Sequence, residues 1–170
     1  MRFPDFLKTA VLLFGGAATV LALVAILGAT RIEDATTVYL AAAWWVIAAC
    51  AGLWFGRRPA TTEGIARMMA EAKNQAALPE LRPGAIVINR LWLLGLTTIT
   101  AGAVAFLVPQ VPAILTGYCL AVALAWRRQS QAVEAIEGRD GVRFYVDASS
   151  PFGPTKLIRT PGFRRVEPVS

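Results

Sequence analysis

The chain has 170 residues, of which 56% are hydrophobic and 16% are charged, and its formal net charge is +6. This composition is too apolar for an ordinary soluble domain. Whether it indicates a membrane protein depends on how the apolar residues are grouped, because a helix needs about 20 of them in succession to cross a bilayer.

The first half of the chain contains two uncharged apolar blocks of this length. Residues 10–29 form the first block, with a basic residue on either side. Residues 37–56 form the second, which follows two acidic residues and precedes Arg57 and Arg58. Each block predicts one transmembrane helix. A cleaved signal peptide is the alternative for the first block, but the block is longer than a usual signal core and no clean cleavage site follows it.

A third apolar run, residues 91–126, is long enough for almost two crossings, at roughly 54 Å as one helix. Pro109 and Pro112 interrupt it, and each proline disfavours the α conformation in the residue before it. We therefore expect a turn there and two crossings, at residues 91–108 and 110–126. The turn should lie at the membrane surface, since in hydrocarbon it would expose backbone polar groups. One long helix kinked at Pro109 is the alternative, but it would leave its second half in water.

Lysine and arginine are distributed unevenly between the two sides that this topology creates. The amino-terminal segment, the loop at residues 57–90 and the tail together hold sixteen of them, and the opposite side holds only Arg31. Because cytoplasmic segments carry the excess of basic residues, we expect both termini on the cytoplasmic side of a bacterial-type inner membrane. Four arginines flank the expected crossings there and should meet anionic lipid headgroups: Arg57, Arg58, Arg127 and Arg128.

Small residues recur at every fourth position in the second and fourth crossings. They are Ala48, Gly52 and Gly56 in the second, and the fourth contains Gly117 and Ala121 in a similar row. Small side chains let helix backbones approach closely in lipid. We expect these rows to pack the four helices together, with self-association into a homo-oligomer as the second interpretation.

The cytoplasmic segments carry weaker structural signals. Within the loop at 57–90, residues 61–78 have an amphipathic pattern that predicts a helix along the inner leaflet or against the tail. A short helix ended by Gly138 is expected after the fourth crossing. Residues 142–147 alternate apolar and polar side chains, and residues 155–160 are also strand-like, which predicts a small β-hairpin. Two strands alone are marginal in water, so the hairpin needs support from the loop, the lipid surface or another chain.

The tail mixes apolar and basic residues in a way that is unusual for a solvated linker. We expect a compact basic module that docks on anionic headgroups or an acidic partner. The residues expected to dock are Arg143, Phe144, Lys156, Arg159, Arg164 and Arg165. The tail resembles no recognised nucleic-acid-binding module, so a nucleic-acid partner is not expected.

Together these patterns predict an all-α integral membrane protein with four transmembrane helices in two hairpins. We expect residues 1–128 to form the transmembrane domain and residues 129–170 to form the cytoplasmic tail with its β-hairpin. The sequence has no histidine and no recognisable nucleophile, metal-ligand or phosphate-binding motif. We therefore expect no enzyme activity, catalytic residue, metal site or cofactor.

None of the expected crossings contains Asp, Glu, Lys or Arg, which argues against an ion-coupled transporter acting alone. We expect a structural or accessory component that acts through its cytoplasmic face, with the lipid bilayer and a larger membrane complex as partners. The alternative is a subunit of a passive channel or transporter, formed by oligomerisation along the threonines of the third crossing.

Overall fold

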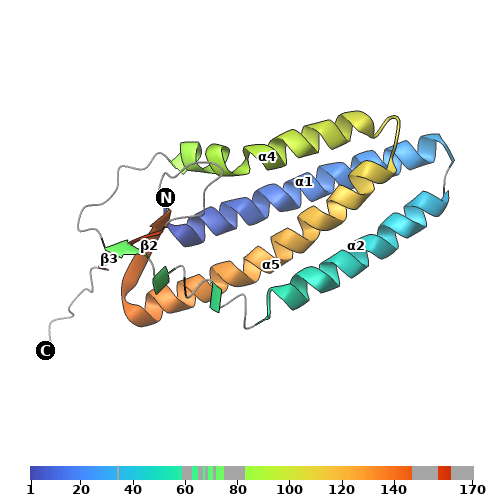
Figure 1. The fold of residues 1–170 in the computed structure, drawn as a ribbon. Coiled ribbons are helices and arrows are strands. Elements are labelled where there is room, and N and C mark those ends of the chain that lie inside the picture. The colour runs from blue at the N-terminus through green and yellow to red at the C-terminus, as the bar shows by residue number, and fades with distance from the viewer. Residues whose placement is uncertain are drawn as a thin grey trace, which may run out of the picture.

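The computed structural model describes residues 1–33, 35–58, 63–64, 67, 69–70, 72–74, 83–146 and 157–161. These residues are mostly helical, with long helices side by side and a small sheet near one end of the bundle (Figure 1). The elements in chain order are α1 (Phe3–Arg31), α2 (Ala35–Phe55), β1 (Lys73–Asn74), α4 (Pro83–Val104), α5 (Gln110–Asp140), β2 (Val142–Val146) and β3 (Leu157–Pro161).

Helices α1 and α2 contain the first two apolar blocks. Helix α1 starts well before its block, with a proline in its first turn, where the missing N–H costs nothing. It ends at Arg31, and the chain reverses through Glu33, which has a positive φ of 53°. Helix α2 then runs close to the predicted bounds. The amino-terminal turns of α1 thus extend beyond the apolar block toward the sheet (Figure 1).

The turn predicted at the two prolines is present. Helix α4 ends at Val104 instead of Val108, and α5 begins at Gln110, so Pro112 lies in the first turn of α5. The backbone N–H of Val108 bonds to the carbonyl of Val104 at 2.9 Å, and Pro109 disfavours continuation of the helix through Val108. The chain therefore forms a hairpin here and not one kinked helix.

Helix α4 also begins earlier than the third apolar run, at Pro83 instead of Leu91. Pro83 suits a helix start, because the first N–H groups of a helix have no partner within it. Arg90, which was expected in the loop, therefore lies within the helix.

Three described helices are long and apolar enough to cross a membrane: α1, α2, and α4 from Gly84 to Val104. Helix α5 is as long as α1, but its apolar part ends at Trp126 and is followed by two arginines.

Helix α5 continues without a break to Asp140, across the boundary expected at residue 128. The separate short helix expected after the fourth crossing is therefore wrong, and Gly138 does not end it. Gly141 ends α5 instead, with a φ of 63° and its N–H bonded to the carbonyl of Glu137 at 3.1 Å. Left-handed backbone of this kind favours glycine, and Gly138 remains helical.

The two hairpins interleave. Helix α5 packs along both α1 and α2, and α4 packs against α1, so the order across the bundle is α4, α1, α5, α2 (Figure 1). The most extensive packing joins α1 to α5, which are far apart in the sequence. The bundle therefore becomes complete only when the fourth helix is in place.

The predicted antiparallel strand pair is confirmed: β2 pairs with β3, with Val146 opposite Leu157. The loop contributes β1, which pairs in parallel with β3 through Lys73 and Asn74. The helix predicted over residues 61–78 is therefore wrong at these two positions, because pairing with β3 satisfies their backbone groups. Five described residues earlier in the predicted helix are helical: Glu63, Gly64, Arg67, Met69 and Ala70. Most of its other residues lie outside the described part of the chain.

Candidate functional site

A cluster of large buried side chains joins distant segments of the chain at the end of the bundle where the sheet lies. We call it the basal cluster. Its members come from the start of α1, the loop, the start of α4, the second half of α5 and both long strands: Phe3, Phe6, Leu7, Met69, Ile86, Val133, Val142, Phe144, Val146 and Leu157. Burying each large apolar side chain contributes about 1.5–3 kcal/mol. The β-hairpin is therefore supported by the helices and by the loop.

One face of α5 carries the helix from the bundle into the basal cluster. Trp126, Ser130, Val133 and Glu137 recur every three or four residues, so they lie on the same side of the helix. The last three are buried, and Trp126 packs edge-on against Phe14 of α1, with the ring centroids 5.5 Å apart. This continuous face explains why α5 does not stop at the two arginines.

Glu137 is a buried carboxylate with two strong partners. Its side chain is 5% exposed, Arg2 Nη2 donates to its Oε2 at 2.6 Å, and the backbone N–H of Phe144 donates to its Oε1 at 2.9 Å. The hydrogen bond to Glu137 raises the pKa of the Arg2 guanidinium above its usual value. The carboxylate thereby links the amino terminus, α5 and β2.

The first two residues extend this link along the sheet. The backbone N–H of Val146 donates to the carbonyl of Met1 at 3.1 Å, and Arg2 forms an isolated antiparallel bridge with Tyr145. The amino terminus therefore continues the pairing at the edge of β2. It is held by backbone pairing, by the partly buried ion pair and by the apolar contacts of α1.

The docking residues predicted in the tail differ in their surroundings. Arg143 and Arg159 are exposed on the sheet, whereas Phe144 is only 3% exposed and packs within the basal cluster. Phe144 therefore lies in the core of the module and not on its surface. The other three predicted docking residues lie outside the described part of the chain: Lys156, Arg164 and Arg165.

The four flanking arginines are exposed, and they lie where α2 ends beside α5. The guanidinium carbon of Arg58 lies 3.7 Å from the ring centroid of Trp54, a cation–π arrangement. A Cβ added to Gly56 would lie 3.2 Å from the Cβ of Arg128, so the two arginine pairs are neighbours. Arg57 and Arg127 complete this basic band.

The small residues predicted for helix packing lie between α2 and α5. A Cβ added to Gly52 would lie 2.5 Å from the carbonyl oxygen of Ala121, so the two backbones are in direct contact. Ala48 is buried one turn earlier in α2. A Cβ added to Gly117 would collide with the indole of Trp44, because only 2.1 Å would separate it from Nε1.

Two adjacent tryptophans add polar contacts to this interface. Trp44 Nε1 donates to the carbonyl of Ile114 at 3.1 Å, and Trp45 Nε1 donates to that of Ala113 at 2.8 Å. Neither tryptophan is among the helix-packing residues expected from the sequence. Their position deep in an apolar block is the signal for such bonds, because an indole N–H needs a partner away from water.

Several threonines of the helices donate to carbonyls of their own helix. The hydroxyls of Thr97, Thr98 and Thr116 each donate to a carbonyl four residues earlier, at 2.9, 2.7 and 2.8 Å. Such bonds are the ordinary state of threonine in membrane helices. The channel hypothesis places the threonines of the third crossing along the path, and the hydroxyls of Thr97 and Thr98 there already donate to their own helix.

Sequence patterns do not predict the pair of Arg2 and Glu137, because the two residues are 135 positions apart. The available signal is the place of Glu137 on the same face of α5 as Val133.

A scan against protein-family models, a search of the curated proteins and a search of the solved structures each find no match for the chain.

Proposed function

We propose that the chain crosses a bacterial-type cytoplasmic membrane four times, with both termini inside. The arrangement of the ends supports this proposal. The starts of α1 and α4, the end of α2, the polar half of α5 and the sheet lie toward one end of the bundle (Figure 1). Apart from Arg31, which lies at the opposite end, the described lysines and arginines lie in these segments or in the parts of the chain next to them. Basic residues favour the cytoplasmic side of a membrane.

The fourth crossing is formed by residues 110–126 of α5. This segment is about 25 Å long as a helix, somewhat less than the ~30 Å hydrocarbon core. It packs between α1 and α2, which both qualify as spans. Arg127 and Arg128 extend its reach, because long basic side chains can run along apolar surface to the headgroups.

We propose that the protein is a structural or accessory component of the membrane that acts through its basal end. The observation that carries this proposal is the basal cluster, which ties the amino terminus, the loop, α5 and the tail into one compact unit. Arg143 and Arg159 are exposed on that unit and fit an acidic protein partner or anionic headgroups. The unit would present them in a fixed geometry.

The competing proposal is a subunit of a passive channel or transporter. Several copies would have to enclose a path along the exposed side of α4. The hydroxyls of Thr97 and Thr98 on that helix already donate to carbonyls of the same helix. Flux measured in proteoliposomes at increasing protein density tests this proposal directly, and density-dependent flux would favour the channel.

Topology is tested with probes at single positions in the full chain. Probes at residues 1 and 170 and near Asn74 should report the cytoplasm, and probes at residues 32–36 or at Gln110 should report the outside. The physical basis is the charge asymmetry together with the proline turn. A probe at Gln110 that reports the cytoplasm would overturn the fourth crossing.

The accessory role is tested by removing charge without disturbing the core. In the full chain, Arg143→Ser combined with Arg159→Ser should reduce recovery of a larger complex on native gels at least severalfold. Arg139→Ser is the matched control, because Arg139 is exposed at the end of α5 and pairs with its neighbour Asp140. Unchanged complexes in the double variant, with loss of complexes after changes in α4, would favour the channel subunit.

A further inference from the structure

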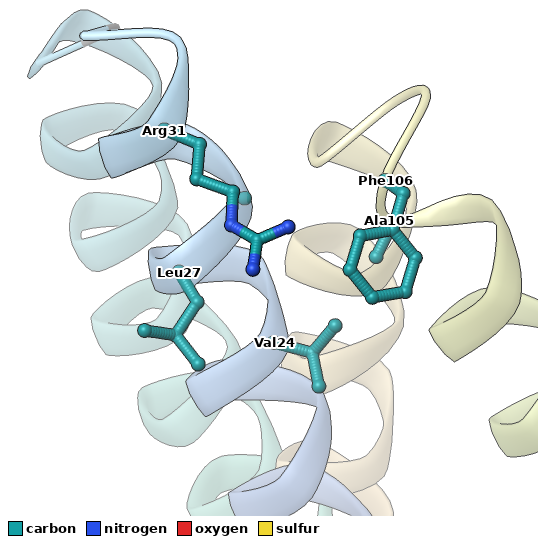
Figure 2. A pocket seen from close by; sticks show the side chains of 6 residues that line it. Val24, Leu27, Arg31, Ala105 and Phe106 are labelled. Atoms are coloured by element: carbon teal, nitrogen blue, oxygen red, sulfur yellow. The ribbon is translucent and has the colours of Figure 1, made fainter.

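A shallow groove lies at the end of the bundle opposite the basal cluster, between α1 and the turn that follows α4 (Figure 2). Its volume is about 140 Å³, and it is lined by Val24, Leu27, Gly28, Arg31, Ala105 and Phe106. At Gly28, an added Cβ would lie 3.1 Å from the carbonyl oxygen of Ala105. The close approach of α1 to the turn therefore closes one side of the groove. Apart from Arg31, its lining is apolar.

Arg31 stands at the mouth of this groove. Its guanidinium extends toward the ring of Phe106, and the guanidinium carbon lies 5.5 Å from the ring centroid (Figure 2). Among the described residues, this ring contact is the one interaction that the structure gives the Arg31 side chain. A guanidinium held against a ring still has N–H groups free at its edge, and those groups match the oxygens of a phosphate.

We propose that the groove binds one membrane phospholipid, with its phosphate on Arg31 and part of one acyl chain along Val24 and Leu27. An apolar groove at the rim of a transmembrane bundle opens to the acyl chains of the bilayer. Arg31 is the only lysine or arginine between Lys8 and Arg57. A phosphate group supplies the complementary charge at the level where the helix ends. That the groove meets the outer leaflet of the bilayer rests on the proposed topology, but the affinity of the purified chain for a phospholipid does not.

The shape of the groove favours a lipid over a free phosphate ion. A free phosphate would gain one guanidinium and would leave the apolar lining unfilled. A lipid fills the lining with an acyl chain, and each methylene buried there adds to binding. The volume holds only a part of such a chain, so the rest would remain in the bilayer.

The test uses the full chain, purified in mild detergent, delipidated and titrated with dioleoyl phosphatidylglycerol under native mass spectrometry. The wild type should bind one lipid tightly. Arg31→Gln should bind about tenfold more weakly, because it loses a charged hydrogen-bond pair, and Arg31→Lys should recover part of the affinity. Val24→Trp should abolish the binding by filling the groove.

Two matched controls separate this site from general lipid adhesion. Leu12→Trp adds the same side chain at an exposed position of α1, and Arg139→Gln removes an exposed arginine at the basal end. Both should bind lipid as the wild type does. Wild-type affinity in Arg31→Gln and Val24→Trp would overturn the proposal, and so would displacement of the lipid by millimolar inorganic phosphate.

Failure of this inference is distinguishable from failure of the proposed function. If the lipid binds as expected but the probes at residues 32–36 and at Gln110 both report the cytoplasm, the site stands and the proposed orientation is wrong. If the probe reports the outside and the lipid does not bind, the orientation stands and the lipid site is wrong.

Discussion

The interface between α2 and α5 and the basal cluster hold the same long helix by opposite means. The interface brings backbones into contact through Gly52 and Ala121, whereas the basal cluster fills the space between elements with side chains such as Phe144. In lipid, apolar side chains gain nothing by leaving their solvent, so close backbone packing must hold the helices. Beyond the expected crossings, burial of large apolar groups stabilises the contact. The two regions should therefore tolerate different changes.

The largest effect is expected where a big side chain leaves the basal cluster. Phe144→Ala should cost about 3–5 kcal/mol of the stability of the sheet, because it leaves a cavity among buried residues. Hydrogen exchange of the β2 amides measures this cost in the full chain. Leu23→Ala, at a 57% exposed position of α1, is the control and should leave exchange unchanged. Equal protection in Phe144→Ala and the wild type would mean that the cluster does not support the strands.

The reverse change should break the helix interface. Gly52→Leu should cost about 1–3 kcal/mol or more and lower accumulation in the membrane, because even its Cβ would meet the backbone of Ala121. Gly95→Leu is the matched control, since nothing lies within 4 Å of a Cβ at that position of α4. Thermal stability in detergent and the amount of inserted protein are the measurements. Equal tolerance of both substitutions would indicate that the spacing of small residues is accidental.

A smaller effect is expected at the carboxylate that links the amino terminus to the sheet. Glu137→Gln should lower the stability of the sheet by about 1 kcal/mol. The amide oxygen still accepts from the N–H of Phe144, and Arg2 loses its negative partner but is itself partly exposed to water. Glu134→Gln is the control, because the pair of Glu134 with Lys8 is exposed. Hydrogen exchange at Val146 reports both variants. If Glu134→Gln lowers the protection of the Val146 amide as much as Glu137→Gln does, the buried carboxylate has no special role.

Local rules predicted the parts of this fold that local chemistry determines. The apolar blocks gave α1 and α2, the pair Pro109 and Pro112 gave the turn, and the alternation over residues 142–147 gave β2. In each case a few neighbouring residues decide the structure. The deciding features are an unbroken apolar run, a proline without an N–H, and apolar side chains at every second position.

Contacts between distant segments determined the parts that local rules did not predict. Helix α5 continues past Arg128 because its buried face meets the start of α1, and Lys73 and Asn74 are extended because β3 pairs with them. The order α4, α1, α5, α2 likewise depends on contacts between helices that are far apart in the sequence, such as α1 and α5. A propensity is overruled when a tertiary partner satisfies the backbone or the apolar face. At the candidate site, the exposed arginines could be named from sequence, but Glu137 required the fold.

The contact of Met1 with Val146 has a consequence for biosynthesis. A ribosome makes the amino-terminal turn of α1 before β2, so Phe3, Phe6 and Leu7 have no strand to pack against while the segments between them are being made. During that interval these side chains are an exposed apolar surface, which a chaperone or, in the proposed topology, the bilayer would cover. Synthesis of β2 and β3 would then release that cover, so the basal end can close only after both strands have been made.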